Sequence, residues 1–376
     1  MKFRVDRDVL AEAVAWTARS LPNRPAVPVL AGVLLETSTD GVLTISSFDY
    51  EVSARSEVPA EVSAAGVAVV QGKMLADIAK ALPPKPVEIE LEGTKLVLTC
   101  GASRFSLHTM PEDDYPDLPS FPEASGTVDA GAFNEAVLQV TTAASRDETL
   151  PLLTGVRMEI EGERITFLAT DRYRLAMKEI AWTPGSPDIS QVALVRARTL
   201  SDVAKSMTQA GTLEIALETG NGKQLVGFDA AGRRTTSQLI EGDYPPVRRL
   251  FPEATPTYAV ARTAEIIEAT RRVALVAERN TPIRLSFTEG QVTLEAGQGE
   301  DAQASEALEA TLVGEDITTA FNPHLFLDGL TALGTEYVRL GFTNPTKPVL
   351  MSGKTSAEGE DHEEFLYLLM PIRFAS

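Results

Sequence analysis

The sequence is short of the features that mark secreted, membrane-spanning and metal-dependent proteins. Its 376 residues include a single cysteine, Cys100, so no disulfide can form within the chain, and we expect it to work in a reducing cytoplasm. No apolar run reaches the roughly 20 residues that cross a bilayer. The N-terminal segment MKFRVDRDVL (1–10) also lacks the apolar centre of a signal peptide. The strand-like pattern KLVLTC (95–100) makes Cys100 a small core residue.

Histidine is also scarce, and the usual signatures of catalytic sites are missing. The three histidines, His108, His324 and His362, have no spacing typical of metal ligands. HEEF (362–365) lacks the second histidine of the zinc-protease motif, and the sequence contains no phosphate-binding loop, dinucleotide-binding glycine motif or nucleophile elbow. The Asn-Gly pair within ETGNGKQL (218–225) predicts a tight hairpin turn instead. We therefore expect neither a cofactor nor a metal ion.

Positive charge is in deficit, with a formal net charge of −19 at pH 7. Such a balance discourages non-specific binding to polyanions, and it argues against nucleic acid as a partner unless a local basic surface exists. The length is too great for a single hydrophobic core and predicts two or three domains.

Internal repeats in the sequence favour three domains over two. Matching segments recur at a spacing of about 122 to 129 residues, which is the size of a domain rather than of a solenoid unit. The matches are PVLAGVLLE (28–36) with PLLTGVRME (151–159) and TPIRLSF (281–287); FDYEVSARSEV (48–58) with TDRYRLAMKEI (170–180); LADIAKAL (75–82) with LSDVAKSM (200–207) and FLDGLTAL (326–333); and DYPDLP (114–119) with DYPPVR (243–248). We predict three tandem similar domains, at 1–122, 123–252 and 253–376.

Each repeat has the same internal plan. An amphipathic helix opens it, alternating strands follow, and a second short helix precedes further strands. The opening helices are predicted within 6–21, 129–144 and 262–277, and the second helices within 72–82, 200–207 and 326–333. Proline-rich segments at 113–126 and 243–256 mark the domain boundaries. The predicted fold class is α+β, with two helices packed on antiparallel sheets in each domain.

One charged cluster, TDRYR (170–174), stands in an otherwise apolar run and needs a partner or a function. Catalysis is a weak hypothesis, because flanking arginines favour the ionised form of Asp171 and make it a poor general base. Asp171 also has a counterpart, Asp49, in a segment that lacks both arginines, so the shared aspartate is most simply a turn residue. For Arg172, Tyr173 and Arg174, a binding surface is favoured over a structural ion pair.

Four segments together carry a resemblance to a known family: MKFRVDRDVL (1–10), RPAVPVL (24–30), ATDRYRLA (169–176) and YLLMPIRF (367–374). In this order and over the full length, they resemble the bacterial DNA polymerase III β subunit, the replicative sliding clamp and processivity factor. The resemblance implies the DNA clamp fold and a head-to-tail homodimeric ring of six domains around double-stranded DNA. It implies no enzymatic activity. The implied partners are the replicative DNA polymerase, the clamp loader and other proteins with clamp-binding peptides, with no role for a membrane.

By matching positions, the resemblance implies a pocket for short peptides. Apolar side chains would receive side chains such as Leu and Phe, and arginines would fix polar groups. The implied pocket residues are Leu153, Thr170, Arg172, Tyr173, Arg174, Leu175, Pro245, Arg249, Leu250, Leu368, Met370, Pro371, Ile372 and Arg373. Arg172 stands where the family often has Gly, and Tyr173 where it often has His.

Two further surfaces follow from the resemblance. Duplex DNA would be held through its phosphates, without base readout. The candidate DNA-facing residues are Arg24, Lys73, Lys80, Arg146, Arg196, Arg198, Lys205, Arg271, Arg272 and Arg279, and ordinary solvated helix faces are the alternative for them. The dimer interface would join Lys73, Arg104, Phe105 and Leu107 of the first domain to Ala274, Leu275, Glu300, Asp301 and Glu306 of the third. A core position is the alternative for Phe105.

Two other functions compete with the clamp. One is a multidomain enzyme that acts on an anionic substrate near Asp171 and Arg174, and the other is an acidic scaffold that never meets DNA. The absence of a nucleophile–base or metal constellation counts against the enzyme, and the threefold repeat has no evident use in it.

Overall fold

The structure, a computed structural model, describes residues 1–22, 24–220, 223–277, 281–297 and 302–373. It divides into two compact units. Unit 1 comprises residues 1–131, 183–186 and 202–239, and unit 2 comprises residues 132–182, 187–201 and 240–376. The second repeat is therefore shared between the units, and the domain boundaries at 122/123 and 252/253 stay a prediction.

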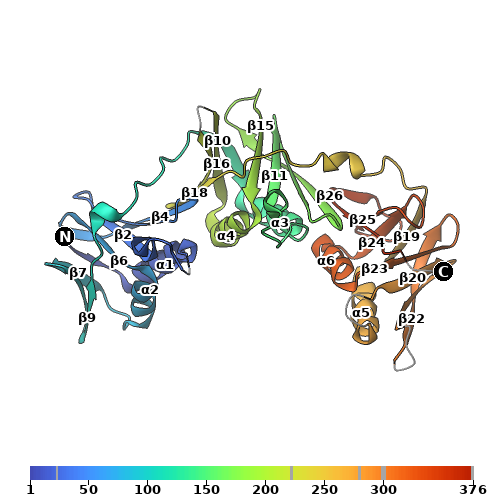
Figure 1. The fold of residues 1–376 in the computed structure, drawn as a ribbon, viewed down its shortest axis with the longest axis horizontal. Coiled ribbons are helices and arrows are strands. Elements are labelled where there is room, and N and C mark those ends of the chain that lie inside the picture. Colours follow the sequence, from blue (N-terminus) through green and yellow to red (C-terminus); the bar gives the residue numbers. More distant parts are fainter. Residues whose placement is uncertain (23, 221–222, 278–280, 298–301, 374–376) are drawn as a thin grey trace. The chain divides into compact units, whose positions relative to one another are not determined.

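Six α-helices occur in the described residues (Figure 1), and they fall at the six predicted segments. They are α1 (Arg7–Thr17), α2 (Gly72–Ala81), α3 (Ala130–Thr141), α4 (Ala197–Met207), α5 (Thr263–Val273) and α6 (Pro323–Leu333). Short 3₁₀ helices are η1 (Ala18–Ser20), η2 (Pro28–Ala31), η3 (Glu112–Asp114), η4 (Pro151–Thr154), η5 (Thr208–Ala210), η6 (Val247–Leu250) and η7 (Ala274–Val276).

Local chemistry explains where the helices begin and end. The Asp6 carboxylate accepts a hydrogen bond from the backbone N–H of Asp8 at 2.8 Å and so caps α1. Asn322 caps α6 in the same way, and Pro323 follows it in the first turn, where its missing N–H costs nothing. At the other end of α6, Gly334 adopts the left-handed conformation (φ 64°) that glycine reaches without strain.

Unit 1 contains two antiparallel sheets. The five-stranded sheet has the order β5-β1-β7-β8-β9, with β1 (Lys2–Val5), β5 (Glu61–Ala64), β7 (Val87–Glu92), β8 (Lys95–Cys100) and β9 (Ser103–His108). The nine-stranded sheet has the order β14-β10-β16-β17-β18-β4-β3-β2-β6, with β2 (Gly32–Thr37), β3 (Val42–Phe48), β4 (Val52–Pro59), β6 (Gly66–Gln71), β10 (Ala124–Asp129), β14 (Thr183–Pro184), β16 (Thr212–Gly220), β17 (Lys223–Ala230) and β18 (Arg233–Gln238).

Unit 2 contains one antiparallel sheet of twelve strands, in the order β15-β11-β12-β13-β26-β25-β24-β19-β22-β21-β20-β23. Its strands are β11 (Gly155–Glu161), β12 (Arg164–Thr170), β13 (Arg174–Ala181), β15 (Ser190–Arg196), β19 (Thr257–Arg262), β20 (Ile283–Thr288), β21 (Gln291–Ala296), β22 (Ala304–Val313), β23 (Ile317–Phe321), β24 (Tyr337–Phe342), β25 (Val349–Lys354) and β26 (Asp361–Leu369).

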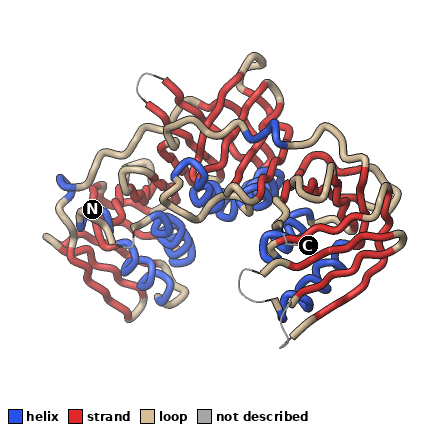
Figure 2. The backbone as a smooth tube through the Cα atoms, turned by 45° about the vertical axis from the view of Figure 1, so that its right-hand side comes forward, coloured by secondary structure: helices blue, strands red, loops and turns tan. Residues whose placement is uncertain are grey.

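Helices and sheets share their cores within each unit. Helices α1 and α2 lie side by side and α1 packs on β3 and β4, while α5 and α6 lie side by side in unit 2 (Figure 2). Cys100 is fully buried in the core of unit 1, and its thiol donates to the carbonyl of Lys85 at 3.3 Å. The prediction of a core cysteine is confirmed. Of the described helices, none has the length and apolar character that crossing a membrane requires.

Several other local predictions have clear outcomes. Strands β16 and β17 pair from Gly220 and Lys223 outward, which confirms the hairpin; the Asn-Gly turn itself lies outside the described residues. In the proline-rich segments, the described backbone forms only η3 and η6 before β10 and β19 begin.

Candidate peptide-binding surface

The turn at Asp171 is built by its side chain. One carboxylate oxygen of Asp171 accepts hydrogen bonds from the backbone N–H groups of Tyr173 (3.0 Å) and Arg174 (3.1 Å). This turn places Arg172 at a positive φ of 81°. Asp49 makes the same turn in the first repeat, because its carboxylate accepts from the N–H groups of Glu51 and Val52. The predicted turn role of both aspartates is confirmed.

Arg174 lies beneath the surface, in an ion-pair network. Its side chain is only 9% exposed, and its guanidinium donates to Asp171 at 3.0 Å and to Asp328 of α6 at 2.6 Å. A third hydrogen bond reaches the hydroxyl of Tyr367 on β26 at 3.3 Å. Burial opposes the charge, but the Tyr367 hydroxyl and the two carboxylates outweigh burial and raise the pKa of Arg174. For Arg174, the structure shows the ion pair that the sequence left open beside a binding surface, and its place in the predicted pocket stays a prediction.

An apolar cluster lies beside this network. It joins Leu153 of η4, Leu175 of β13 and Leu368 of β26 to four further buried residues, Leu168, Leu194, Tyr244 and Val247. The backbone N–H of Thr170 donates to the Tyr244 hydroxyl at 3.1 Å, and burial raises the pKa of this tyrosine to about 12. This hydrogen bond fixes the end of β12 against the connection that follows β18.

Three large apolar side chains are exposed within three residues, along the chain, of members of this cluster (Leu175, Val247 and Leu368). Tyr173 is 57% exposed, Leu250 is 56% exposed and Met370 is 44% exposed. The backbone N–H of Met370 donates to the carbonyl of Tyr173 at 2.9 Å, so the C-terminal segment is held against the Asp171 turn. We call Tyr173, Leu250 and Met370 the apolar surface. An exposed apolar group of this kind is typical of an interaction site rather than of a reaction centre.

The remaining predicted pocket residues differ in how far their side chains are buried. Thr170 is buried and its hydroxyl donates to the carbonyl of Arg174. Pro371 and Ile372 are half-buried, and the Ile372 N–H donates to the carbonyl of Ala320 on β23 at 2.8 Å. Arg172, Pro245, Arg249 and Arg373 are exposed. Sequence reasoning missed Asp328, Tyr367 and Tyr244. Signals were present: Asp328 aligns with Asp77 and Asp202 in the second-helix repeat, Tyr367 opens YLLMPIRF, and Tyr244 lies in the repeated DYP motif.

Unit 1 holds a counterpart of this arrangement with different side chains. The N–H of Gln238 donates to the carbonyl of Glu51, as Met370 does to Tyr173. Where β13 and β26 bring Leu175 opposite Leu368, however, β4 and β18 bring Ser53 opposite Thr236. The apolar lining is thus a property of the unit 2 arrangement rather than of the repeated backbone.

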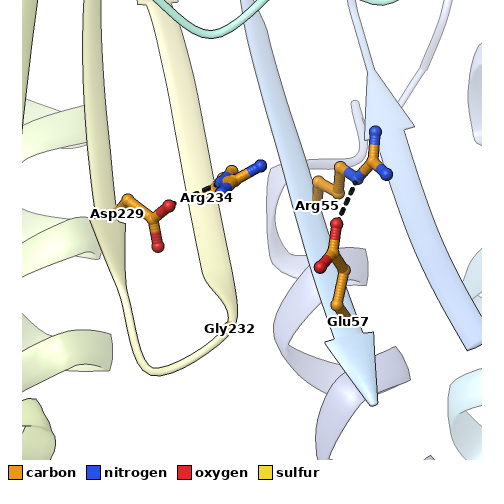
Figure 3. A pocket seen from close by; sticks show the side chains of 5 residues that line it. All are labelled: Arg55, Glu57, Asp229, Gly232 and Arg234. Carbon is orange, nitrogen blue, oxygen red and sulfur yellow. Dashed lines mark hydrogen bonds and ion pairs between the residues drawn. The ribbon is translucent and has the colours of Figure 1, made fainter. Parts of the chain in front are cut away.

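A second candidate site lies between β4 and β18 in unit 1 (Figure 3). A cavity of about 30 Å³ is lined by two ion pairs, Arg55 with Glu57 (3.1 Å) and Arg234 with Asp229 (2.5 Å), together with Gly232. Arg55 and Arg234 stand directly opposite each other in the strand pair, and each has a carboxylate partner. The space holds about one water molecule and its charges are already paired, so it suits a structural role.

The predicted DNA-facing residues differ in their environment. Arg24, Lys80, Arg146, Arg198 and Lys205 are exposed. Arg271 and Arg272, on the last turn of α5, are engaged in ion pairs with Glu268 and Glu306. Lys73 is exposed and Arg196 is half-buried, and both have interaction partners. Arg279 lies outside the described residues.

The predicted interface residues differ in exposure within the single chain, and their assignment to an interface stays a prediction. Leu107 is 6% exposed and packs in the core of unit 1, because β9 places it opposite the buried Leu96. Phe105 is 38% exposed and Leu275 is 83% exposed, so both are available to a partner. Arg104 and Lys73 are exposed, Ala274 is half-buried, and Glu306 pairs with Arg272; Glu300 and Asp301 lie outside the described residues.

Known proteins match this chain over its whole length. Family models for the N-terminal, central and C-terminal domains of the DNA polymerase III beta subunit match residues 1–119, 127–246 and 248–373. The beta sliding clamp of Streptomyces coelicolor is 54% identical over 100% of both chains. The beta sliding clamp of Micrococcus luteus is 59% identical over 83% of this chain and 100% of its own.

Solved structures show the same fold. A Pseudomonas aeruginosa DnaN sliding clamp bound to griselimycin superposes with a TM-score of 0.92 at 26% identity, with 100% of both chains covered. The sliding clamp of Bacillus subtilis gives the same TM-score, identity and coverage. The threefold α+β repeat, the three domain matches and the full-length relatives agree, and the chain belongs to the DNA polymerase III beta subunit family, the bacterial sliding clamps.

Proposed function

We propose that two copies of this sliding clamp close head to tail into a ring of six similar domains that encloses duplex DNA. The ring would tether the replicative polymerase, the clamp loader and other partners through short peptides, in the cytoplasm. The observation that carries this proposal is the threefold repeat of one α+β domain, matched along the whole chain by the three domains of the clamp family. The clamp is a processivity factor, so the hypothesis of an enzyme near Asp171 and Arg174 is wrong.

Retention of DNA by a closed ring reconciles the acidic composition with a DNA function. A ring needs only weak contacts with phosphates, and strong contacts would slow its sliding. The exposed basic residues Arg24, Lys80, Arg198 and Lys205 suit this role, since each presents a positive charge that attracts phosphates. Arg271 and Arg272 suit it less well, because neighbouring glutamates already neutralise them.

Ring closure is assigned to the two exposed apolar side chains at the predicted interface. Leu275 and Phe105 are costly to leave in water, and burial in a contact between two copies would remove that cost. Arg104 and Glu306 add charges of opposite sign to the two sides, although each has an intrachain partner, Glu92 and Arg272 respectively.

Peptide binding is assigned to the apolar surface. Tyr173, Leu250 and Met370 present apolar area to solvent, and the ion-pair network of Arg174 holds the turn that carries Tyr173. The apolar cluster adjoins this surface along the chain and includes buried Leu153, Leu175 and Leu368. This combination of a rigid base and exposed aromatic and aliphatic side chains suits the anchors of a short peptide.

Direct binding to linear duplex DNA tests the phosphate contacts. Wild-type protein should bind weakly, and its affinity should fall steeply with salt, since each neutralised phosphate contributes roughly 0.9 to the slope of log affinity against log salt. Replacing both Arg24 and Arg198 by Glu should weaken this binding further and leave peptide affinity unchanged, as measured by fluorescence anisotropy.

A charge-matched control is available on the paired arginines of Figure 3. Replacing both Arg55 and Arg234 by Glu changes the net charge equally but removes no predicted DNA contact. Equal weakening by the two double variants would assign the effect to overall charge and contradict the mapped surface. Tight binding of linear DNA in physiological salt would contradict retention by a ring.

A further inference from the structure

Two pairs of strands join one repeat to the next, and their side chains differ. In unit 1, β4 of the first repeat pairs with β18 of the second. In unit 2, β13 of the second repeat pairs with β26 of the third. We call these strand pairs the first seam and the second seam. Each has five register pairs, so a difference in their strength must come from the side chains.

The centre of each seam is buried, but only the second seam is apolar there. Leu175 lies opposite Leu368 in the second seam, whereas Ser53 lies opposite Thr236 at the corresponding place in the first. All four side chains are buried. The two hydroxyl side chains remove much less apolar area from water than the two leucines do, so the first seam gains less from closing.

Like charges face each other at the next position of the first seam. Arg55 of β4 stands directly opposite Arg234 of β18. The carboxylate partner of Arg55 is Glu57 on the same strand, and the partner of Arg234 is Asp229 on β17, so neither of these ion pairs spans the seam (Figure 3). Like charges directly opposite each other destabilise a strand pair.

Buried ion pairs cross the second seam and have no counterpart in the first. Arg174 and Lys178 of β13 are each 9% exposed. Arg174 crosses the seam through the network described above, and the Lys178 ammonium lies 3.4 Å from the carboxylate of Glu364 on β26. The matching residues of β4 are Val52 and Ser56. Opening the second seam would leave buried charges without partners, which is costly.

The contacts that tie the first seam together are exposed. Arg233 of β18 pairs with the exposed carboxylate of Glu12 on α1, and its guanidinium lies 5.6 Å from the centre of the Trp16 ring. The side-chain amide of Gln238 donates to the carbonyl of Tyr50 at 2.9 Å, also at an exposed position. Exposed ion pairs contribute modestly to stability, so these contacts do not replace the buried ones of the second seam.

We propose that the first seam is a hinge. Strands β4 and β18 separate locally far more readily than β13 and β26, so the first repeat swings at this seam while the second seam stays closed. The hinge is a property of the single chain, but its use rests on the proposed ring. A closed ring must part to admit DNA, and bending at the first seam gives each copy the compliance for this without disturbing the apolar surface of unit 2.

Amide hydrogen exchange of the full-length protein, followed by mass spectrometry and corrected for intrinsic rates, tests the hinge. Segments 52–56 and 233–237 should exchange at least about tenfold faster than segments 174–178 and 365–369, because several cross-strand differences add together. Equal exchange at the two seams, or faster exchange at the second, would overturn the proposal. A monomeric protein that shows the predicted difference would contradict the ring and leave the hinge intact.

A double variant transplants one pair from the second seam, in which Met177 lies opposite Leu366. Arg55→Met with Arg234→Leu removes the repulsion and adds an apolar contact at an exposed position, so the fold should tolerate it. Exchange at the first seam should slow by about threefold or more. Exchange at the wild-type rate in the folded variant would overturn the assignment of the weakness to these side chains.

The control removes the same charge away from the seam. Arg4→Met with Lys95→Leu changes two exposed positions on β1 and β8, in the five-stranded sheet of unit 1, whereas the first seam lies in the nine-stranded sheet. Exchange at the first seam should stay at the wild-type rate. Equal slowing by the two double variants would assign the effect to overall charge and contradict the hinge as described.

Discussion

Replacing Leu275 by Asp should convert the dimer into folded monomers. Leu275 is 83% exposed in the single chain, so the substitution removes almost no contact within the fold. In a closed ring, the same change would bury an unpaired carboxylate in an apolar contact, at a cost of about 3–5 kcal/mol per interface. Both interfaces of a two-fold ring carry the change, so the expected shift in the dimer equilibrium is large. Sedimentation velocity measures the species directly, and circular dichroism shows whether the monomer is folded.

Val192→Asp is the control for this experiment. Val192 is 48% exposed on β15, outside every surface assigned here to a partner, so the variant should remain dimeric. Phe105→Asp should behave like Leu275→Asp, because the proposal places it on the opposing side of the contact. A persistent dimer in both the Leu275 and Phe105 variants would show that the ring closes through other residues.

Removing residues 370–376 should abolish peptide binding and leave the fold intact. The deletion removes Met370 together with Pro371 and Ile372, so a peptide loses its contacts with the Met370 part of the apolar surface. Loss of such central anchors typically costs 2 kcal/mol or more, which predicts a decrease in affinity of about 100-fold or greater. Calorimetric titration with a short peptide that carries leucine and phenylalanine side chains measures this loss.

The fold should tolerate this deletion because β26 ends at Leu369. The strand keeps its pairing with β13 and β25, and the deleted segment contributes two described backbone hydrogen bonds, to Tyr173 and to Ala320. Deletion of residues 374–376 alone leaves Met370 to Arg373 in place and should preserve binding. Wild-type affinity in the longer deletion, with an unchanged thermal transition, would contradict the assignment of the C-terminal segment.

Repetition made much of the fold predictable. Three copies of one pattern located both helices of each repeat, and comparison of Asp49 with Asp171 identified a turn residue from the sequence alone. The strand-like apolar pattern of KLVLTC placed Cys100 in the core, as the structure confirms. These features are local in the chain, so short segments of sequence contain enough information to predict them.

Contacts between distant segments could not be predicted in this way. Arg174 is paired with Asp328 and Tyr367, more than 150 residues away, and nothing in TDRYR indicates that this arginine is buried while its neighbours are exposed. Leu107 shows the same difficulty, since an edge strand offers no sequence signal for which of its apolar residues the core covers. Arg272 and Glu306 were assigned to two different surfaces, yet they form one ion pair across α5 and β22.

Retention on circular and linear DNA tests most directly whether this clamp holds DNA by encircling it. The protein is loaded by a clamp loader onto a nicked circular plasmid, and the complex is separated from free protein by gel filtration in high salt. The account predicts that the clamp stays with the circle, because salt screens phosphate contacts but cannot open a closed ring. Linearising the plasmid before filtration should release the clamp, which slides off the ends. Equal retention on the linear and circular forms would contradict the account and indicate that surface contacts alone hold the DNA.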